Sequence, residues 1–278
     1  MQVLICGARG STPTPGSEFV RYGGNTACVA IARDGESPSL ILDAGTGLTR
    51  LSKLLDGHPF RGTILLGHLH WDHTHGLPFF AAGDRFDSRV SVLMPADGDP
   101  EDLIARVISP PHFPIGPEEL EGDWTFARIR EGEHEIEGFS VLAVEVPHKG
   151  GRTFGYRISD SEQAVAYLSD HAPQALGLGR SGLGELHEAA RALADGASVL
   201  IHDAQYTADE FERVSRFGHS AVEYAIDLAR ECEVPRLLLF HHDPGRTDDQ
   251  IDAIVAAHDG RSNPTVEAAA EGTMIDLG

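Results

Sequence analysis

Residues 67–73 read GHLHWDH and follow directly on an apolar run at residues 63–66. The apolar run predicts a buried strand, and the histidines come where that strand ends. Side chains on an extended backbone alternate in direction, so His68 and His70 leave the chain on the same face. This spacing predicts a strand that runs into a metal-binding loop.

Asp72 and His73 complete the loop where the chain is expected to turn into a helix, and there they can face a second ion. Imidazole mixed with carboxylate suits zinc and its neighbours, whereas calcium and magnesium sites use oxygen ligands. The alternative is a surface histidine cluster or a tag-like tract. Such a tract does not follow a buried strand or contain a lone aspartate, so we predict a metal site.

The length of 278 residues fits one large α/β domain or two small ones. No Ser/Pro/Gly-rich linker divides the sequence, so we expect a single domain spanning residues 1–278. A hydrophobic fraction of 41% can supply a sizeable core. No apolar run reaches the length of about eighteen residues that a membrane span requires, so we expect no contact with a membrane.

The first seven residues, MQVLICG, lack a basic segment and a long apolar stretch, which predicts a first strand rather than a signal peptide. Cys6, Cys28 and Cys232 are odd in number and widely spaced, which fits reduced, packed thiols better than a disulfide framework. Both features predict a cytoplasmic protein. No cysteine lies near a ligand motif, so the expected site contains only nitrogen and oxygen ligands.

Charge is strongly unbalanced, with 22 Lys and Arg against 43 Asp and Glu and a formal net charge of −21. Such a field repels polyanions at long range, so a large nucleic-acid partner is not expected. A small anionic substrate remains compatible with it, because two divalent ions would add positive charge inside the site.

The remaining pattern predicts a mixed α/β organisation. Strands are expected at residues 2–6, 27–32, 39–43, 63–66 and 90–94, with helices at 47–55 and 74–81. Strands near 125–130, 139–146, 153–159 and 164–169 resemble a meander. The last third alternates helices at 184–194, 220–230 and 247–257 with strands at 197–202 and 236–240. Capping boxes are expected at the pairs Thr207/Glu210, Ser220/Glu223 and Thr247/Gln250.

The order His-x-His-x-Asp-His after a strand resembles the signature of the metallo-β-lactamase-fold hydrolases. Residues 68–77, HLHWDHTHGL, are most similar to the phosphodiesterase branch, which includes tRNA 3′-processing ribonucleases and cyclic-nucleotide phosphodiesterases. Flavo-diiron oxidoreductases of this fold carry Glu where this chain has His70, so hydrolysis is favoured over oxygen chemistry. The resemblance implies an α/β fold, a four-layer αββα sandwich.

The resemblance also implies a site for two divalent transition-metal ions, with Zn²⁺ expected and Mn²⁺ or Fe²⁺ as alternatives. It assigns His68, His70 and His148 to one ion, Asp72, His73 and His241 to the other, and Asp170 to both. An isolated histidine at a strand end is more often a surface residue than a ligand. Here, however, three strand ends complete one set of seven ligands. His242 is the alternative to His241, which we prefer because it follows the strand directly.

Two later segments resemble catalytic motifs of tRNA 3′-processing enzymes. Residues 200–204, LIHDA, resemble their His-Glu-Ala-Thr segment with Asp203 replacing Glu, and residues 218–220, GHS, resemble their His-Ser-Thr segment. The resemblance implies that His219 protonates the leaving oxygen or stabilises the transition state, and that Asp203 orients it. An imidazole held by a carboxylate suits proton donation at physiological pH. Alternatively, both are ordinary turn residues, and Ser220 is a helix cap.

The expected reaction is hydrolysis of a small cyclic or linear phosphodiester by a metal-bound hydroxide, which Asp72 would orient. One alternative is a tRNA 3′-end endoribonuclease, which the charge and the lack of a Lys-rich RNA-gripping arm disfavour. Another is a lactone or thioester hydrolase of the same fold, and the non-enzymatic alternative is a degenerate binding module. A homodimer stays open.

Two loops allow two interpretations each. Arg9, in the loop at residues 7–13, either contacts an anionic substrate or is a solvated loop charge. Residues 109–115, SPPHFPI, form a stiff segment because the prolines restrict the backbone. This segment is either a lid that holds Phe113 over the site or a surface strap.

Overall fold

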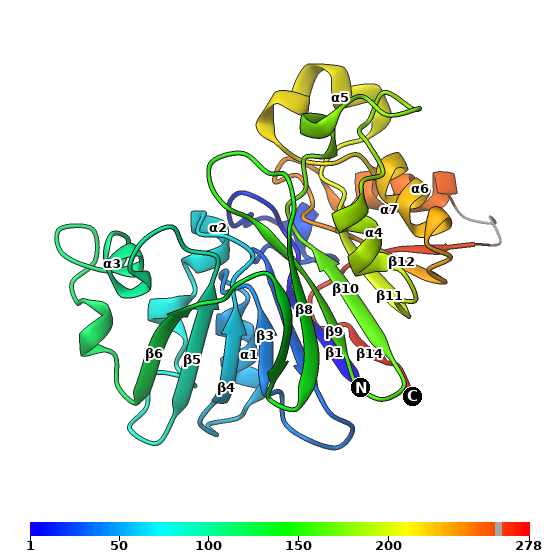
Figure 1. Cartoon of the computed structure of the whole chain (residues 1–278). Helices are drawn as coiled ribbons and strands as arrows, with labels where there is room; N and C mark the ends of the chain where they lie inside the picture. The colour runs from blue at the N-terminus through cyan, green and yellow to red at the C-terminus, as the bar shows by residue number, and fades with distance from the viewer. Residues whose placement is uncertain (259–262) are drawn as a thin grey trace.

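Two seven-stranded sheets occupy the middle of the molecule in the residues that the computed structural model describes, 1–258 and 263–278 (Figure 1). The first sheet has the order β14 (Met274–Asp276), β1 (Gln2–Gly7), β2 (Cys28–Ala32), β3 (Leu40–Leu42), β4 (Arg61–Leu65), β5 (Arg89–Met94) and β6 (Asp123–Arg128). The second has the order β13 (Thr265–Ala268), β12 (Arg236–Phe240), β11 (Val199–Asp203), β10 (Ala164–Leu168), β9 (Phe154–Ser159), β8 (Phe139–Glu145) and β7 (Gly132–Ile136).

Each sheet is partly parallel and partly antiparallel. Strands β3 to β6 are parallel in the first sheet, and β10 to β13 are parallel in the second. Antiparallel pairs join β7 to β10, and β1 pairs with both β2 and β14, so the two ends of the chain lie close together. Since the carboxyl ends of parallel strands meet at one edge, loops that are distant in sequence converge there.

Apolar side chains that alternate between the two faces of each strand form a core between the sheets and further cores on their outer faces. In β1, Val3 and Ile5 face the cluster between the sheets, while Leu4 and Cys6 join the cluster on the outer face of the first sheet. Successive side chains on a strand point to opposite faces, so one strand supplies two apolar layers. Both sheets are therefore covered on both faces.

Helices cover the two outer faces and complete the predicted four-layer αββα sandwich, which is confirmed. The helices are α1 (Leu48–Leu54), α2 (Trp71–Thr74), α3 (Pro100–Ala105), α4 (Glu188–Ala194), α5 (Ala208–Val214), α6 (Val222–Glu231) and α7 (Asp248–His258). Short 3₁₀ turns lie at Ser17–Phe19, Leu77–Phe79, Pro117–Glu119, Pro173–Leu176 and Ser215–Phe217. In the described part of the chain, no helix has the length and hydropathy needed to span a membrane.

Two secondary-structure predictions were wrong, and one strand was not predicted. The helix expected at 74–81 is replaced by the short α2 and a 3₁₀ turn around Pro78. The strand near 125–130 is β6, which pairs with β5 in the first sheet, so the meander of the second sheet begins instead at β7. We missed β7 because its sequence, GEHEI, is charged, as is common for an edge strand.

Two of the three capping boxes are present. Glu210 accepts hydrogen bonds from the backbone N–H and hydroxyl of Thr207, and Gln250 accepts one from the backbone N–H of Thr247. The Ser220 box is wrong, because α6 begins only at Val222 and the buried Ser220 hydroxyl has no hydrogen-bond partner among the described residues.

Candidate active site

The metal loop begins where β4 ends and leads into α2. A hydrogen bond from the Gly67 N–H to Asp43 Oδ1, 2.7 Å long, fixes the chain just after the strand. His68 then lies buried, His70 lies at the surface, and α2 turns the loop back toward the sheet. The extended backbone and the helical turn thus direct the loop's ligand-type side chains into one region.

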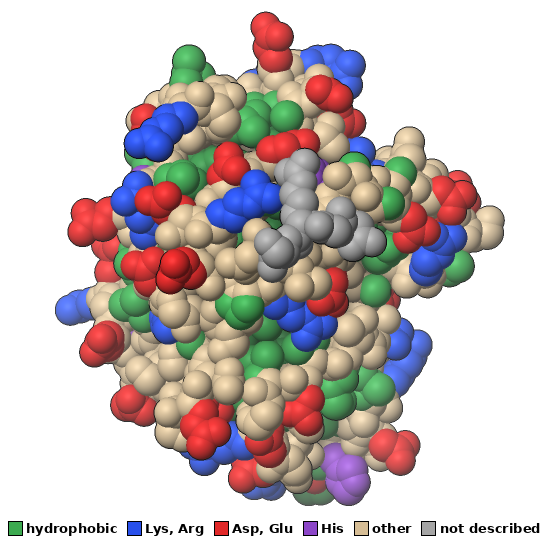
Figure 2. All heavy atoms as spheres, turned by 90° about the vertical axis from the view of Figure 1, so that its right-hand side faces the viewer, with side chains coloured by type: hydrophobic (Ala, Val, Ile, Leu, Met, Phe, Trp, Pro, Cys, Tyr) green, Lys and Arg blue, Asp and Glu red, His purple; other side chains and the backbone are tan. Residues whose placement is uncertain are grey.

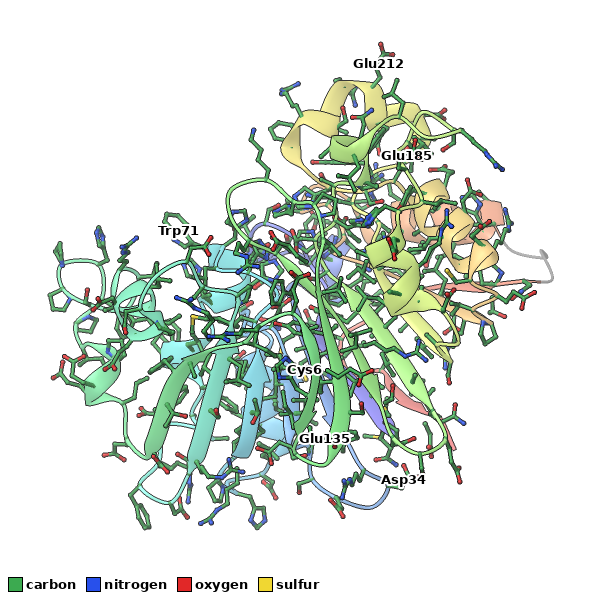
Figure 3. The ribbon with its side chains drawn as sticks, in the orientation of Figure 1. Cys6, Asp34, Trp71, Glu135, Glu185 and Glu212 are labelled. Carbon is green, nitrogen blue, oxygen red and sulfur yellow. The ribbon has the colours of Figure 1, made fainter. Side chains whose placement is uncertain are left out.

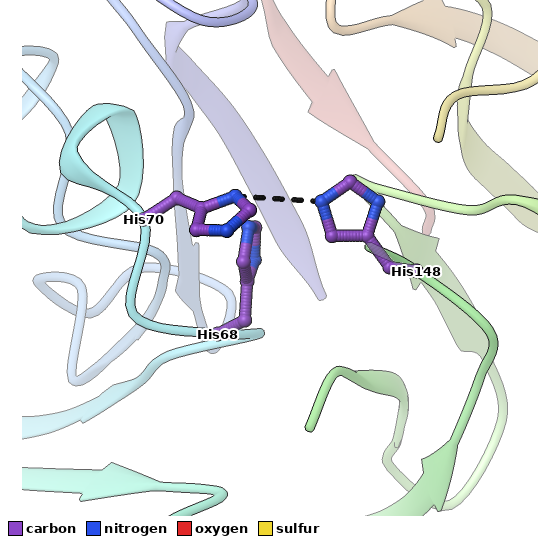
Figure 4. Close-up of side chains that lie close together, drawn as sticks. All are labelled: His68, His70 and His148. Atoms are coloured by element: carbon purple, nitrogen blue, oxygen red, sulfur yellow. Dashed lines mark hydrogen bonds between the residues drawn. The ribbon is translucent and has the colours of Figure 1, made fainter. Parts of the chain in front are cut away.

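His68, His70 and His148 form the first trio of ligand-type side chains (Figure 4). One ring nitrogen from each lies within 4.8 Å of the others. His148 comes from the loop after β8, so this trio joins the two sheets. His148 Nε2 lies 3.4 Å from His70 Nδ1. The two coordinating nitrogen atoms of imidazoles on one tetrahedral zinc ion would be about 3.3 Å apart at ordinary bond lengths. The observed nitrogen–nitrogen distance therefore fits a shared ion.

Asp72, His73 and His241 form the second trio. Asp72 Oδ2 lies 3.3 Å from His73 Nε2 and 3.1 Å from His241 Nε2. All three residues are buried. His241 follows β12, so this trio also draws one ligand from the second sheet.

Asp170 lies between the two trios. Its Oδ2 is 2.9 Å from His73 Nε2 and 3.4 Å from His241 Nε2, while its Oδ1 is 3.7 Å from His148 Nε2. One carboxylate thus faces both groups of ligands. The structure brings all seven predicted ligands together, and their binding of metal stays a prediction.

His241 belongs to the cluster, whereas its neighbour His242 faces away from it. The His241 backbone has a positive φ of 59°, an uncommon conformation that turns the chain sharply after β12. His242 Nε2 lies 2.9 Å from the carbonyl oxygen of Ala269. Gly10 packs so closely on the His241 ring that a Cβ atom would lie 2.5 Å from Nδ1.

Several buried ligand-type atoms lack hydrogen bonds within the described chain. They are both ring nitrogens of His68, Nε2 of His73, Nδ1 of His241 and Oδ2 of Asp170, although His73 Nε2 and Asp170 Oδ2 lie 2.9 Å apart. Buried polar atoms are normally hydrogen-bonded, so a group of exceptions on facing side chains needs a partner. Divalent metal ions fit this donor set of imidazole and carboxylate.

The electrostatics of the cluster favour bound positive charge. Burial lowers the pKa of His68 well below its usual value, which keeps the ring neutral, as a metal ligand must be. Burial would also lower the pKa of His73, but nearby carboxylates, Asp72 foremost, raise it well above its usual value. Against the same burial, Asp170 and a hydrogen bond with Asp72 raise the pKa of His241 to about 9.

His219 and Asp203 lie together beside this cluster. His219 Nδ1 is 3.1 Å from Asp203 Oδ2 and 3.4 Å from Asp170 Oδ1. Asp203 is fully buried, and it also accepts hydrogen bonds from the backbone N–H groups of His171 and Gln205. These hydrogen bonds hold the Asp203 carboxylate against Nδ1 of His219, on the same edge of the ring that Asp170 approaches.

Sequence reasoning missed two residues that hold candidate ligands. Asp43 Oδ2 lies 2.8 Å from His73 Nδ1, and its backbone has a positive φ of 60°. The backbone N–H of Ser11 donates to Asp72 Oδ2 at 2.7 Å, and Ser11 also has a positive φ. Asp43 ends the predicted strand at 39–43, so the signal was a strand-end carboxylate, whereas nothing local marks Ser11.

Both expectations for Arg9 were wrong. Its side chain is fully buried, donates to the carbonyl oxygens of Gly23 and Arg246, and lies 3.5 Å from Asp248. It therefore ties the loop after β1 to the loop after β12, next to His241. Arg9 contacts neither solvent nor the site pocket.

A pocket of about 380 Å³ opens on the cluster. It is lined by His70, Asp72, Asp170 and His219, together with Ser11, Leu69 and Trp71. Residues 109–115 contribute nothing to its lining; Phe113 instead packs against Phe79, with ring centroids 5.6 Å apart. The strap interpretation therefore fits better than the lid. A larger cavity of about 470 Å³ lies between α4 and α6 and contains none of the cluster's residues.

Residues 40–242 match the family model described as a beta-lactamase superfamily domain. The chain belongs to the β-lactamase superfamily. Together with the ligand cluster, this membership confirms the fold and the enzyme class that the sequence predicted, a metal-dependent hydrolase of that superfamily.

Named members of the superfamily resemble the chain over most of its length. A Ribonuclease Z of Natronomonas pharaonis is 27% identical over 276 residues, which cover 87% of this chain and 86% of that protein. The human tRNase Z short form has a TM-score of 0.68 at 20% identity, with full coverage of both chains. A diphosphatase of the PhnP family has a TM-score of 0.67 at 16% identity, covering 100% of this chain and 98% of its own. The two solved structures support the fold alone.

Proposed function

We propose that this superfamily member is a phosphodiesterase that uses two metal ions, and the His219–Asp203 contact carries the proposal. Hydrolysis of a phosphodiester releases an alkoxide that must be protonated, so a proton donor beside the metal ligands favours this reaction. With Nδ1 held by Asp203 at 3.1 Å, the ring is left with Nε2 for a substrate oxygen. The pocket reaches His219, so a substrate can approach this ring.

The seven clustered side chains would hold the ions, with zinc as the expected metal and Mn²⁺ or Fe²⁺ as alternatives. Bound there, two divalent ions would supply positive charge for the phosphoryl oxygens and lower the pKa of water. The chain's own residues orient the site: Asp43 holds His73, and the Ser11 N–H holds the Asp72 carboxylate. Asp203 positions His219, which can donate its proton to the leaving oxygen.

Within this reaction class we favour a substrate of nucleotide size. The net charge of −21 disfavours a long polyanion. On the face that carries α6 and α7, Lys and Arg side chains are interspersed with Asp and Glu rather than gathered in one basic patch (Figure 2). The pocket of about 380 Å³ is small enough for one nucleotide-sized group.

Processing of tRNA 3′ ends is the second candidate, and the comparisons favour it over the small substrate. The curated relatives that cover most of the chain carry the name Ribonuclease Z, including the 27% identical protein of Natronomonas pharaonis. One structural neighbour is a diphosphatase of the PhnP family, but at 16% identity it supports the fold and does not decide between the two substrates. Thioester hydrolysis is disfavoured, because a thiolate leaves without needing a proton from the His219–Asp203 pair. Lactone hydrolysis also expels an alkoxide, and the substrate panel below separates it from phosphodiester hydrolysis.

A substrate panel tests these alternatives. Metal-loaded protein would be assayed on bis-p-nitrophenyl phosphate, cyclic nucleotides, pre-tRNA, a lactone and a thioester at physiological salt. We expect hydrolysis of the phosphodiesters, with kcat/KM for cyclic nucleotides at least equal to that for pre-tRNA. Efficient pre-tRNA cleavage without activity on cyclic nucleotides would replace the small substrate with tRNA. Activity on the lactone or thioester alone would overturn the phosphodiesterase proposal.

A further inference from the structure

Trp71 presents a large aromatic ring on the wall of the pocket that holds the catalytic groups. It begins α2, directly between the predicted ligands His70 and Asp72, and it lines the same pocket as His219. Its side chain is 65% exposed. Figure 3 shows it projecting from the end of α2, away from the sheets.

The His75 imidazole lies beside the indole ring in an offset stack, with ring centroids 5.6 Å apart and the planes inclined by 17°. Among the described residues, His75 is the sole aromatic group in ring contact with Trp71. The contact restrains the indole, and its exposure leaves ring surface free for a ligand at the pocket.

The position explains the exposure but not the choice of tryptophan. Asp72, His73 and Thr74 are buried, whereas Trp71 and His75, four residues apart on one face of the turn, are exposed. A small polar residue would suit this exposed face, whereas an exposed tryptophan leaves a large apolar surface in water. Single exposed aromatic residues are common, but this one borders the proposed reacting centre.

We propose that Trp71 is a stacking platform for a nucleobase that lies next to the scissile phosphodiester. The inference rests on the proposed phosphodiesterase function and specifies its substrate class as phosphodiesters that carry a base. Stacking on an aromatic side chain needs no positive charge, so it can supply affinity in a molecule of net charge −21. It also tolerates different bases, because each has a π-face.

Fluorescence tests binding without turnover, because the chain has two tryptophans. The other, Trp124, lies outside the pocket and donates its indole N–H to the carbonyl oxygens of Gly83 and Glu121. In the metal-loaded Trp124→Phe protein, Trp71 is the sole tryptophan, so tryptophan emission reports on its ring. We expect adenosine 5′-monophosphate to quench its emission saturably and ribose 5-phosphate to leave it unchanged. No quenching at concentrations where the nucleotide inhibits phosphodiester hydrolysis would overturn the proposal.

Kinetics of Trp71→Leu and Trp71→Phe provide the second test. For cyclic AMP, Trp71→Leu should raise KM roughly 5- to 150-fold, the usual loss of one base stack, and Trp71→Phe should raise it less. KM for glycerophosphoethanolamine, a phosphodiester without a ring, should be unchanged in both. Elemental analysis should find the wild-type metal content in both variants. Phe86→Leu removes an 85% exposed aromatic outside the pocket and should change none of these values.

The outcomes separate the two proposals. If wild-type protein hydrolyses no phosphodiester, the proposed function fails. If it hydrolyses phosphodiesters but Trp71→Leu affects substrates with and without a base equally, the stacking inference alone fails. An RNA oligonucleotide forms a parallel arm of the assay. A larger effect of Trp71→Leu on the oligonucleotide than on cyclic AMP would support the platform and assign the stacked base to RNA.

Discussion

Asp43 illustrates how single side chains organise the site without touching a substrate. Its two oxygens accept hydrogen bonds from the Gly67 N–H and the Tyr167 hydroxyl, and Oδ2 also faces His73 Nδ1 at 2.8 Å. The His73 ring is therefore fixed with Nε2 directed at Asp72 and Asp170. A carboxylate behind a ligating histidine sets the tautomer and the orientation of the ring.

Asp43→Asn should consequently weaken metal binding or activity by roughly 10- to 100-fold. The amide retains the shape but lacks the charge that holds the Nδ1 proton of His73. Metal affinity can be measured by competition with a chromophoric chelator. Tyr167→Phe, which removes one donor to the same carboxylate, is the matched control and should cost less. Equal effects of the two variants would argue against an orienting role for Asp43.

His219→Ala separates catalysis from metal binding. The variant should keep the wild-type metal content and lose about 10²- to 10⁴-fold in kcat, because a general acid is absent while the ligands remain. Elemental analysis and steady-state kinetics provide the two measurements. His58→Ala, at an exposed position outside the pocket, is the control. Loss of metal from His219→Ala would give His219 a ligand's role instead.

The ends of neighbouring strands in the second sheet position three carboxylate and imidazole side chains of the site, and α5 positions the segment that carries His219. Asp170 and His241 follow the parallel strands β10 and β12, and Asp203 ends β11 between them. Helix α5 then leads into the segment that carries His219. The start of α5 is held by Glu210, which accepts from Thr207 and from an Arg246 guanidinium N–H at 2.7 Å.

Glu210 should make the protein's stability depend on acid pH. Partial burial alone would raise its pKa, but hydrogen bonds from Arg246 and Thr207 lower it below the usual value. A lowered folded-state pKa means that the carboxylate stabilises the fold above its unfolded pKa of about 4.3, and this contribution is lost as pH falls through the folded pKa. Glu210→Gln should therefore lower the free energy of unfolding by roughly 0.3–1.5 kcal/mol at pH 6, and by less at pH 3.

Urea unfolding of wild type and variant at both pH values measures this difference. Glu212→Gln is the matched control, because Glu212 is exposed on the same helix and labelled in Figure 3. It should leave the free energy of unfolding nearly unchanged. A Glu210→Gln effect of the same size at pH 3 and pH 6 would show that the carboxylate charge is unimportant there.

Both trios of ligands join the two halves of the sandwich. His68, His70, Asp72 and His73 come from the loop after β4 in the first sheet, while His148 and His241 follow β8 and β12 in the second. Ions bound by these residues would cross-link the sheets at one edge. Metal binding is therefore expected to stabilise the whole molecule as well as its reaction.

Protein purified without chelator should contain two transition-metal ions per chain, most of them zinc, by elemental analysis. Removal of metal should lower the melting temperature, because ions that bind the folded state alone stabilise it by about 2.7 kcal/mol at a hundred times Kd. Added zinc should restore the melting temperature, whereas calcium, which prefers oxygen ligands, should not. A fully active protein without transition metal would contradict the proposed site.

The sequence by itself determined the fold class and the residue types of the site. The imidazoles and carboxylates of residues 68–73 follow a strand, and this local pattern depends only on neighbouring residues. The other candidate ligands, His148, Asp170 and His241, also follow apolar strands. Local alternation thus identified strand ends, together with the chemistry that they carry.

Only the tertiary structure decided which side chains meet and which direction each one faces. The local pattern favoured His241 over His242 only because His241 follows the strand directly. The backbone turn with positive φ at His241 places that side chain in the cluster and leaves His242 against Ala269. The sequence around Arg9 is compatible with a solvated loop charge. The tertiary structure instead buries its guanidinium beside Asp248, which is distant in sequence. Phe113, which the lid interpretation placed over the site, packs on Phe79 instead. The aromatic side chain that lines the pocket is Trp71. Each of these outcomes depends on contacts between segments far apart in the chain, which a local pattern does not contain.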